Sequence, residues 1–225
     1  GAEFFGSNGN SVSLNGSGLA KITDINLANL DKRLADTDIE ALCDVVSPLY
    51  GEKGAAHIFA PQKGADSNTV KVLDNGLKNL AEVSKRVIGK DNSQVNGAGA
   101  AGGLGFGLIS FLGARLVKGA PAVLKATGFE NAAKNAELVI TGEGCMDNQS
   151  LLGKAPAEVA LLSGNTPVVA IVGMSKVTDI SDSNIRKIYV TDHDERSFEQ
   201  VLRECREDLA ATAKRVAEDF YNGSF

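Results

Sequence analysis

Residues 66–89 carry the clearest hydrophobic pattern in the chain. Apolar residues recur there at spacings of three and four, which lines them along one face of a helix. Asp66 or Ser67 is suited to the N-cap, and Gly89 is suited to end the helix. The pattern predicts an amphipathic helix that buries Val70, Leu73, Leu77, Leu80, Val83 and Val87.

Short strands are predicted before this helix. Apolar residues at 4–5 and 12–14 flank an Asn-Gly pair, which is the strongest short signal for a β-hairpin. Alternate residues are apolar between 39 and 45, and a short apolar run at 56–60 ends at Pro61. We interpret these segments as strands of a mixed sheet.

Beyond residue 134, short apolar runs alternate with amphipathic stretches, which predicts a βαβ series with parallel strands. The expected elements are strand 138–141, helix 154–162, strands 167–172 and 188–191, and a long final helix. That helix should begin at Ser197, because Gln200 completes a capping box. Its buried face is expected to contain Phe198, Val201, Leu202, Cys205, Leu209, Ala213, Val216 and Phe220.

The predicted fold class is α/β with two domains. Residues 135–225 form a flavodoxin- or Rossmann-like parallel-sheet half-domain, and residues 1–134 form a second, mixed α/β domain. With 225 residues, of which 43% are hydrophobic, the chain is long enough to bury a core.

Composition and charge argue against several classes of partner and site. The net charge is −5 without any run of lysine or arginine, so neither nucleic acid nor an anionic membrane surface is an expected partner. No apolar run approaches the roughly 20 residues of a membrane-spanning helix. Three separated cysteines predict neither a disulfide framework nor a structural zinc site, which favours the reducing cytoplasm.

The stretch ELVITGEGCMDNQSLLGKAP, residues 137–156, is the strongest candidate for chemistry. Glu143 follows a predicted buried strand, and ligands of open parallel sheets bind at the carboxyl ends of the strands. Gly142 and Gly144 would let the backbone take unusual conformations and let a ligand approach closely. The alternative is that Gly-Glu-Gly is simply a tight turn between a strand and a helix.

Further polar residues follow Glu143. Asp147, Asn148 and Gln149 add carboxylate and amide oxygens, and Lys154 begins the next predicted helix. Such a set suits a phosphate with bound magnesium, because carboxylates bind the cation while lysine and backbone N–H groups bind the anion. Lys154 could equally be a solvated helix residue.

A glycine-rich run begins at Gly97 and formally satisfies GxGxxG. It fails as a dinucleotide fingerprint, because residues 88–96 read as a helix end and a polar loop and not as a strand. Two interpretations stay open: the loop wraps a phosphate or carboxylate with its N–H groups, or its small residues allow close packing. The candidate binding glycines are Gly97, Gly99, Gly102 and Gly103. A buried helix is expected over 104–117.

Lys63 is presented by the rigid turn Pro61-Gln62-Lys63-Gly64 and could bind a carboxylate or a phosphate, although surface lysines in turns are more often solvated. His57 lies in an apolar run, which is typical of an interior histidine. His193 could line the sheet edge. Neither histidine has a nucleophile nearby in the sequence, so no hydrolase motif is indicated.

Four motifs together resemble the type 1 glycerate kinases. They occur in order as CDVVSPLYGEKGA, IFAPQKGA, NGAGAAGGLG and TGEGCMDNQSLLGKAP, and the resemblance covers the chain from near Gly1 to its end. Three positions depart from the family pattern. Ser47 replaces an asparagine, Asn96 replaces a proline, and Cys145 stands where arginine is common.

The resemblance implies an ATP- and Mg²⁺-dependent kinase that phosphorylates a hydroxyl of glycerate. In that interpretation Glu143 and Asp147 bind magnesium or orient the hydroxyl, Lys154 and Lys63 bind anionic oxygens, and the glycines contact phosphate or carboxylate. The resemblance also implies a preceding N-terminal segment as a partner in the same protein, and this portion alone is expected to be inactive.

Two other functions remain open on the sequence. One is a non-catalytic binding module for a phosphorylated sugar or a small organic acid. The other is an NAD(P)-linked enzyme that uses the glycine run, which would require a hydrophobic strand directly before Gly97.

Overall fold

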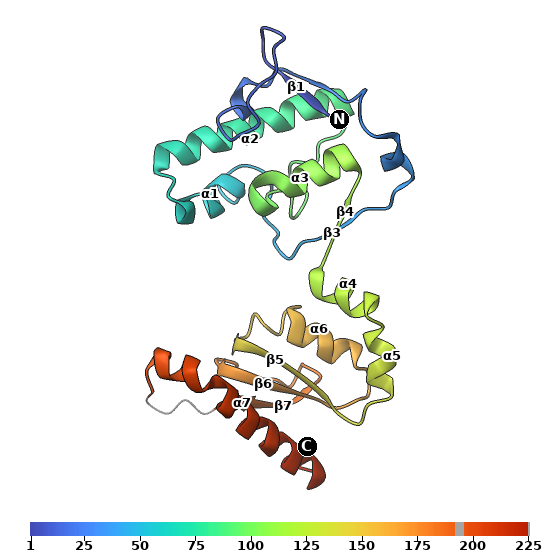
Figure 1. Ribbon diagram of the computed structural model, residues 1–225, viewed down its shortest axis with the longest axis vertical. Coiled ribbons are helices and arrows are strands. Elements are labelled where there is room, and N and C mark those ends of the chain that lie inside the picture. Colours follow the sequence, from blue (N-terminus) through green and yellow to red (C-terminus); the bar gives the residue numbers. More distant parts are fainter. Residues whose placement is uncertain (192–195, 225) are drawn as a thin grey trace. The chain divides into compact units, whose positions relative to one another are not determined.

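The structure is a computed structural model that describes residues 1–191 and 196–224. It has an α/β fold, as predicted, and divides into two compact units, residues 1–119 and 120–225. Figure 1 identifies the elements, and each unit is described by itself.

Two pairs of short strands lie in the first unit. Strand β1 (Glu3–Phe5) runs antiparallel to β2 (Asp24–Asn26), and β3 (Glu40–Leu42) runs parallel to β4 (Arg115–Val117). The predicted hairpin is reduced to one bridge between Phe5 and Ser11, because β2 supplies the partner backbone for β1.

The segment predicted as a strand at 56–60 is instead helix α1 (Ala55–Phe59). Its first two alanines are buried in the core of this unit, and a short 3₁₀ turn that begins at Pro61 follows. An apolar run of five residues does not distinguish a buried strand from a turn of buried helix, so the pattern was ambiguous here.

Helix α2 (Ser67–Ile88) confirms the clearest prediction. Asp66 caps it by accepting a hydrogen bond from the Thr69 N–H at 2.7 Å, and Gly89 ends it with φ of +78°. The core of the first unit contains buried residues of α1, α2 and α3 with Leu49 and Ala98: Ala55, Ala56, Val70, Leu77, Ala81 and Phe106.

Helix α3 (Ala100–Leu112) begins with three residues of positive φ at 101–103, so the regular helix starts at about 104. It ends at Gly113, whose φ is +66°, and not at 117 as predicted. The helix ends earlier than predicted because a glycine with positive φ stops it and residues 115–117 pair as strand β4.

The second unit begins with α4 (Gly119–Ala126) and α5 (Phe129–Lys134). Both helices end at or before residue 134, where the domain boundary was predicted from the sequence. Ala133 is nevertheless buried in the same core cluster as Val139 and Val168. Helix α5 therefore packs with the elements that follow it.

Three parallel strands form the sheet of the second unit, in the order β5 (Val139–Met146), β6 (Val168–Ser175) and β7 (Ile185–Val190). The predicted parallel sheet is confirmed. Strands β5 and β6 continue past their predicted ends, pairing from Val139 with Val168 up to Met146 with Ser175.

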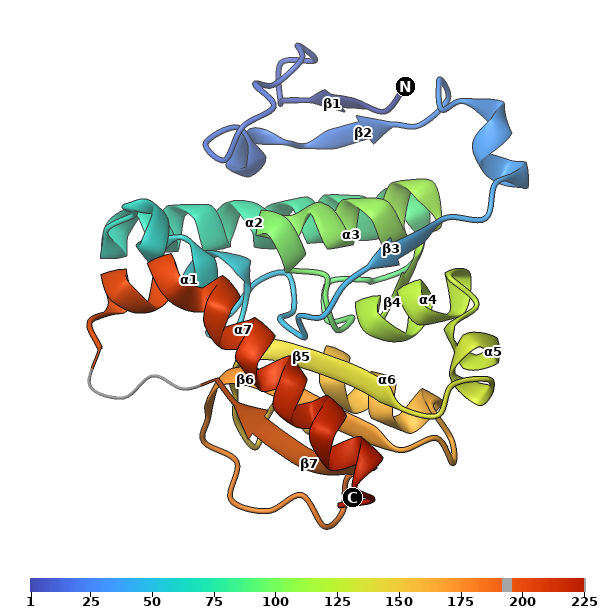
Figure 2. The same cartoon turned by 60° about the horizontal axis from the view of Figure 1, so that its bottom comes forward.

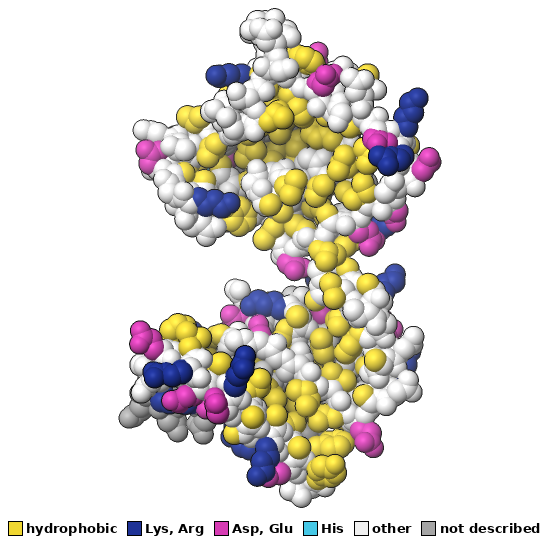
Figure 3. All heavy atoms as spheres, in the orientation of Figure 1, with side chains coloured by type: hydrophobic (Ala, Val, Ile, Leu, Met, Phe, Trp, Pro, Cys, Tyr) yellow, Lys and Arg dark blue, Asp and Glu magenta, His cyan; other side chains and the backbone are white. Residues whose placement is uncertain are grey.

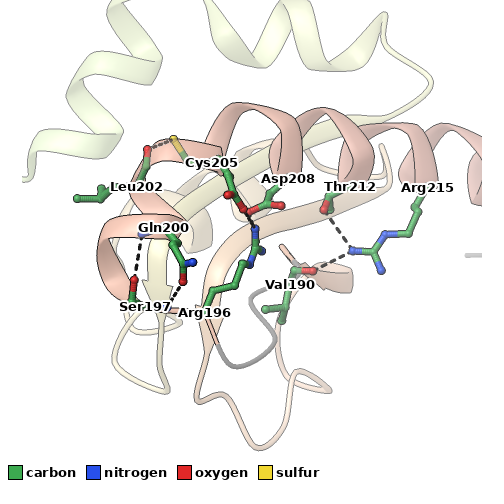
Figure 4. A network of polar contacts seen from close by, with 10 residues as sticks. Val190, Arg196, Ser197, Gln200, Leu202, Cys205, Asp208, Thr212 and Arg215 are labelled. Atoms are coloured by element: carbon green, nitrogen blue, oxygen red, sulfur yellow. Dashed lines mark hydrogen bonds and ion pairs between the residues drawn. The ribbon is translucent and has the colours of Figure 1, made fainter.

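Helices cover both faces of this sheet, with α6 (Ala155–Leu162) on one face and α7 (Phe198–Tyr221) on the other (Figures 1 and 2). The predicted capping box is present: the Ser197 hydroxyl accepts a hydrogen bond from the Gln200 N–H, and the Gln200 side chain accepts one from the Ser197 N–H (Figure 4).

The predicted buried face of α7 is only partly correct. Thr212 and Val216 are buried, whereas Phe198 is 77% exposed and Leu202 is 58% exposed. A helix of 24 residues is about 36 Å long, whereas a strand of eight residues such as β6, along which it runs (Figure 2), is only about 26 Å long. The first half of α7 therefore extends beyond the surface that the sheet offers.

Across the described residues, no helix has the length and hydrophobicity required to span a membrane.

Candidate active site

Glu143 lies inside strand β5 and not in a turn after it, which corrects the prediction. Neither neighbouring glycine has a positive φ. Gly142 is required for another reason, since a Cβ at this position would collide with the carbonyl oxygen of Ile171 on β6. A Cβ at Gly144 would meet open space. Close packing of β5 on β6 thus requires a glycine at position 142 but not at position 144.

The Glu143 side chain lies on the sheet face that bears Val139, because residues two and four apart in a strand share a face. Its partner on β6 is Val172, which is 1% exposed and belongs to the core. The Oε1 atom of Glu143 is buried and has no hydrogen-bond partner among the described residues. A buried carboxylate oxygen without a partner costs free energy, which is typical of a site that a ligand completes.

Asp147 and Lys154 lie together directly after β5. The Lys154 Nζ is 3.5 Å from the Asp147 Oδ1, and Lys154 is the N-cap residue of α6. Ser150 joins them: its N–H and its hydroxyl donate to Asp147 Oδ1 at 2.9 Å and 3.1 Å, and its Oγ accepts from Lys154 Nζ at 3.3 Å. The sequence-predicted pair is therefore one hydrogen-bonded cluster.

This cluster keeps Asp147 ionised. The Ser150 N–H is the largest influence that lowers the pKa of Asp147, and the Ser150 hydroxyl and the Lys154 charge lower that pKa further. A carboxylate that is negative at neutral pH can bind a cation or accept a hydrogen bond from a hydroxyl.

The loops that follow β5 and β6 are tied together at the carboxyl end of the sheet. The Lys176 N–H donates to the Met146 carbonyl at 2.7 Å, and the Thr178 N–H donates to the Asn148 Oδ1 at 3.2 Å. These bonds hold the loop of Asp147 on the sheet edge where ligands of parallel sheets usually bind.

Two carboxylate oxygens on or directly after β5 have no protein partner in the described part of the chain and are the candidates for binding a cation. Asp147 uses Oδ1 for Ser150 and Lys154, and its Oδ2 has no hydrogen bond within residues 1–191 and 196–224. Glu143 Oε1 is also without a partner there. Magnesium is commonly bound by one or two carboxylates, with water and phosphate as its other ligands. No cluster of three or more His, Cys, Asp or Glu able to hold a metal was found in the described chain, so an all-protein metal cage does not fit.

In the first unit, packing accounts for part of the glycine run. A Cβ at Gly99 would collide with the Pro48 carbonyl oxygen, and a Cβ at Gly97 would lie 2.7 Å from the Cys43 Sγ. A Cβ at Gly103 would lie 2.9 Å from Leu49. Only Gly102 is exposed with open space around it. Of the two interpretations, packing explains three glycines, and ligand binding by the run stays a prediction.

Residues 89–96, all of which are described, form turns and contain no strand. The hydrophobic strand that an NAD(P)-binding use of the run requires is therefore missing.

Lys63 and Gly102 line one cavity of about 190 Å³, whose other walls are apolar. Those walls are formed by Gly16, Leu19, Ala55, Ala56, Phe59, Ala60, Leu73 and Leu77. Figure 3 shows hydrophobic side chains gathered around a hollow on this unit. Lys63 and Gly102, both predicted as binding residues, therefore line the same cavity, and Lys63 supplies its positive charge.

His57 takes no part in these clusters. His57, expected in the interior, is exposed, and its Nε2 lies 4.0 Å from the Asp74 Oδ2. His193 lies outside the described residues.

Sequence reasoning missed Ser150 and Thr178. Ser150 is fully buried and contacts both Asp147 and Lys154. Its position three residues after Asp147 is typical of an aspartate-capped turn, which is the signal that could have identified it.

Comparisons with known proteins identify the family of this chain. The family model of the glycerate kinase family matches residues 1–221. The chain is 44% identical over 175 residues to glycerate 2-kinase of Escherichia coli, an alignment that covers 77% of this chain and 46% of that protein. It is 36% identical over 221 residues to glycerate kinase of Bacillus cereus, which covers 96% of this chain and 58% of that protein.

A solved structure shows the same fold. The crystal structure of "putative glycerate kinase 2 from Salmonella typhimurium LT2" superimposes with a TM-score of 0.84 and 35% sequence identity, over 100% of this chain and 59% of that one. The chain spans about half the length of the curated relatives it matches. On the match to the family model and these relatives, the chain belongs to the glycerate kinase family.

Proposed function

We propose that the protein containing this chain transfers the terminal phosphoryl group of ATP to a hydroxyl of glycerate. Family membership supports the reaction class. The observation that carries the assignment of the site is the buried, unpartnered Oε1 of Glu143 on the strand that leads to Asp147 and Lys154.

Each of these residues has a role that its surroundings suit. Glu143 Oε1 accepts a hydrogen bond from the reacting hydroxyl or binds the cation, because no group of the described residues bonds to it. Lys154 binds a phosphate oxygen, since its ammonium has three donors and, among the described residues, only two contacts, with Ser150 and Asp147. Phosphoryl transfer depends mainly on positioning and on charge stabilisation, which these groups provide.

Asp147 Oδ2 or Glu143 Oε1, each without a protein partner among the described residues, would bind the magnesium ion that accompanies the phosphate. The bound ion would neutralise charge on the phosphate oxygens. The hydrogen bonds from Ser150 lower the pKa of Asp147 and so favour its carboxylate form.

Lys63 and Gly102 are proposed to contribute from the first unit. Lys63 is the one charged residue among the residues that line its cavity, so it can bind an anionic oxygen of a ligand there. Gly102 leaves room for a ligand to approach the backbone. Contacts of Gly97, Gly142 and Gly144 with ligand would be made through the backbone, whereas the N–H groups of Gly99 and Gly103 already donate to the carbonyl oxygens of Ser47 and Gly99.

The substitution Glu143→Gln in the full-length protein tests the proposal. We expect ADP release that depends on glycerate to fall by about 100-fold or more, because the charged oxygen is lost. We expect the melting temperature to stay the same or rise, because a buried unpartnered carboxylate is removed. Glu137→Gln, at an exposed position just before β5, is the matched control and should leave both quantities unchanged. A fully active Glu143→Gln enzyme would exclude this residue from the reaction.

Calorimetry with ATP and with glycerate separates a kinase from a binding module. A kinase binds both ligands and releases ADP, whereas a non-catalytic module for a phosphorylated sugar or a small acid binds without turnover.

A further inference from the structure

Ser150 is the centre of the cluster that follows β5. The residue is fully buried, at 0% exposure, whereas the side chains of its two charged neighbours, Asp147 and Lys154, are 42% and 49% exposed. Its hydroxyl donates to Asp147 Oδ1 and accepts from both the Asp147 N–H, at 3.2 Å, and Lys154 Nζ. One donor and two acceptor sites are all that a hydroxyl has, so every one is used.

The two carboxylate oxygens of Asp147 differ in their contacts. Both Ser150 bonds and the Lys154 ion pair fall on Oδ1. Oδ2 has no hydrogen bond to any described residue. The carboxylate is therefore fixed in an orientation that leaves one oxygen open to a ligand.

Ser150 also restricts Lys154. An exposed ion pair with Nζ and Oδ1 3.5 Å apart contributes little by itself and leaves a long side chain free to rotate. The contact from Lys154 Nζ to a buried hydroxyl on a fixed backbone supplies a second anchor.

We infer that Ser150 is a positioning residue that holds Asp147 and Lys154 in the orientation required for phosphoryl transfer. The inference rests on the proposed function, because it assigns the two charged residues to the reaction. It goes beyond that function by making a buried neutral residue responsible for the geometry of both.

The test compares variants of the full-length protein in a coupled ADP-release assay. We expect Ser150→Ala to lower kcat by about 10- to 100-fold and to change KM for glycerate by less than about threefold, because orientation is lost while the charges remain. Ser150→Thr keeps the hydroxyl and should recover most of the loss. Ser163→Ala is the matched control, since Ser163 is 2% exposed in the same unit and its hydroxyl donates only to the Val159 carbonyl.

Two further measurements separate positioning from a purely structural role. In a Lys154→Met background, Ser150→Ala should cost much less than in the wild type, because the residue acts through a group that is already absent. Melting temperatures identify any variant that is merely unfolded. Ser150→Cys, similar in size but a weak hydrogen-bonding partner, takes the place of the alanine variant if that variant does not fold.

A spectroscopic measurement tests the contact without using activity. In ¹⁵N-lysine spectra, the NH₃⁺ signal of Lys154, identified by its absence in Lys154→Arg, should shift or broaden in Ser150→Ala and stay in place in Ser163→Ala. An unchanged signal together with unchanged kcat would overturn the inference. A shifted signal in a protein that never phosphorylates glycerate would overturn the proposed function and leave the positioning contact established.

Discussion

At the scale of single residues, the contrast between Gly142 and Gly144 shows how differently two neighbouring glycines can be constrained. A Cβ at Gly142 meets the backbone oxygen of Ile171, whereas a Cβ at Gly144 meets nothing within 4 Å. A Cβ at Gly173 on β6 would in turn lie 2.6 Å from the Gly144 carbonyl oxygen. Gly142 and Gly173 therefore allow β5 and β6 to approach closely near Glu143.

Gly142→Ala should consequently destabilise the second unit. Backbone atoms cannot move aside as side chains do, so we expect a loss of about 1–3 kcal/mol in the free energy of unfolding, measured by urea denaturation. Gly144→Ala is the matched control and should change it by less than about 1 kcal/mol. Equal losses for the two variants would contradict the argument from close approach.

Several candidate site residues could be proposed from the sequence, but the backbone conformation around them was predicted incorrectly. The candidates at Glu143, Asp147 and Lys154 could be found because polar residues after a buried strand tend to reach a sheet edge. That Glu143 lies within the strand could not be found, because strand length depends on the pairing partner and Gly-Glu-Gly resembles a turn. Ser150 escaped notice because burial of a serine depends on packing that no local pattern reports.

At the scale of elements, caps and long periodic patterns were the reliable signals. Helices α2 and α7 begin at the predicted caps, Asp66 and Ser197, because a capping side chain bonds the backbone within its own segment. Helix α1 was predicted as a strand, since a short and largely apolar run satisfies both patterns. The exposed first half of α7 was missed because burial requires a partner surface.

Helix α7 is attached to the edge strand β7 by an acidic residue near its end. Asp219 Oδ2 accepts hydrogen bonds from Lys187 Nζ and from the Tyr189 hydroxyl, each at 2.6 Å. The bond from Lys187 is the largest influence, and it lowers the pKa of Asp219. A carboxyl group with a lowered pKa in the folded state stabilises the fold above its unfolded pKa, and this contribution is lost as the pH falls through the folded pKa.

We therefore expect Asp219→Asn to lower the melting temperature at pH 7. The difference from the wild type should shrink as the pH falls below about 4, where the wild-type carboxylate also becomes neutral. Melting curves between pH 2 and pH 7 measure this. Glu218→Gln is the control, because Glu218 forms only an exposed pair with Lys214 at 3.8 Å. A constant difference down to pH 2 would rule out the Asp219 bonds as the cause.

At the scale of the whole molecule, the two units have separate hydrophobic cores. In the first unit Leu77 belongs to a cluster with Leu49 and Phe106, and in the second Val168 belongs to a cluster with Met146 and Ala160. The clusters share no residue. The α/β class and the parallel order of β5, β6 and β7 followed from the alternation of patterns, whereas the division of the chain depends on which core a helix such as α5 joins.

Separate cores predict separate local stabilities. Leu77→Ala should lower the amide hydrogen-exchange protection of α2 and leave β6 unchanged, because the cavity forms in the first core. Val168→Ala should lower the protection of β6 and leave α2 unchanged. Hydrogen exchange followed by mass spectrometry measures both. Loss of protection throughout the chain from either substitution would show that the two cores unfold as one.

The unpaired Oε1 of Glu143 has a consequence for crystallography. Desolvating a carboxylate oxygen without giving it a donor is unfavourable, so water or a small cation should compete to occupy the space beside it. Difference electron density at hydrogen-bonding or coordination distance from that atom is the expected feature of a crystal grown without substrate. Exchanging the salt from sodium to manganese should then reveal, by anomalous scattering, which of the two species the fold accepts.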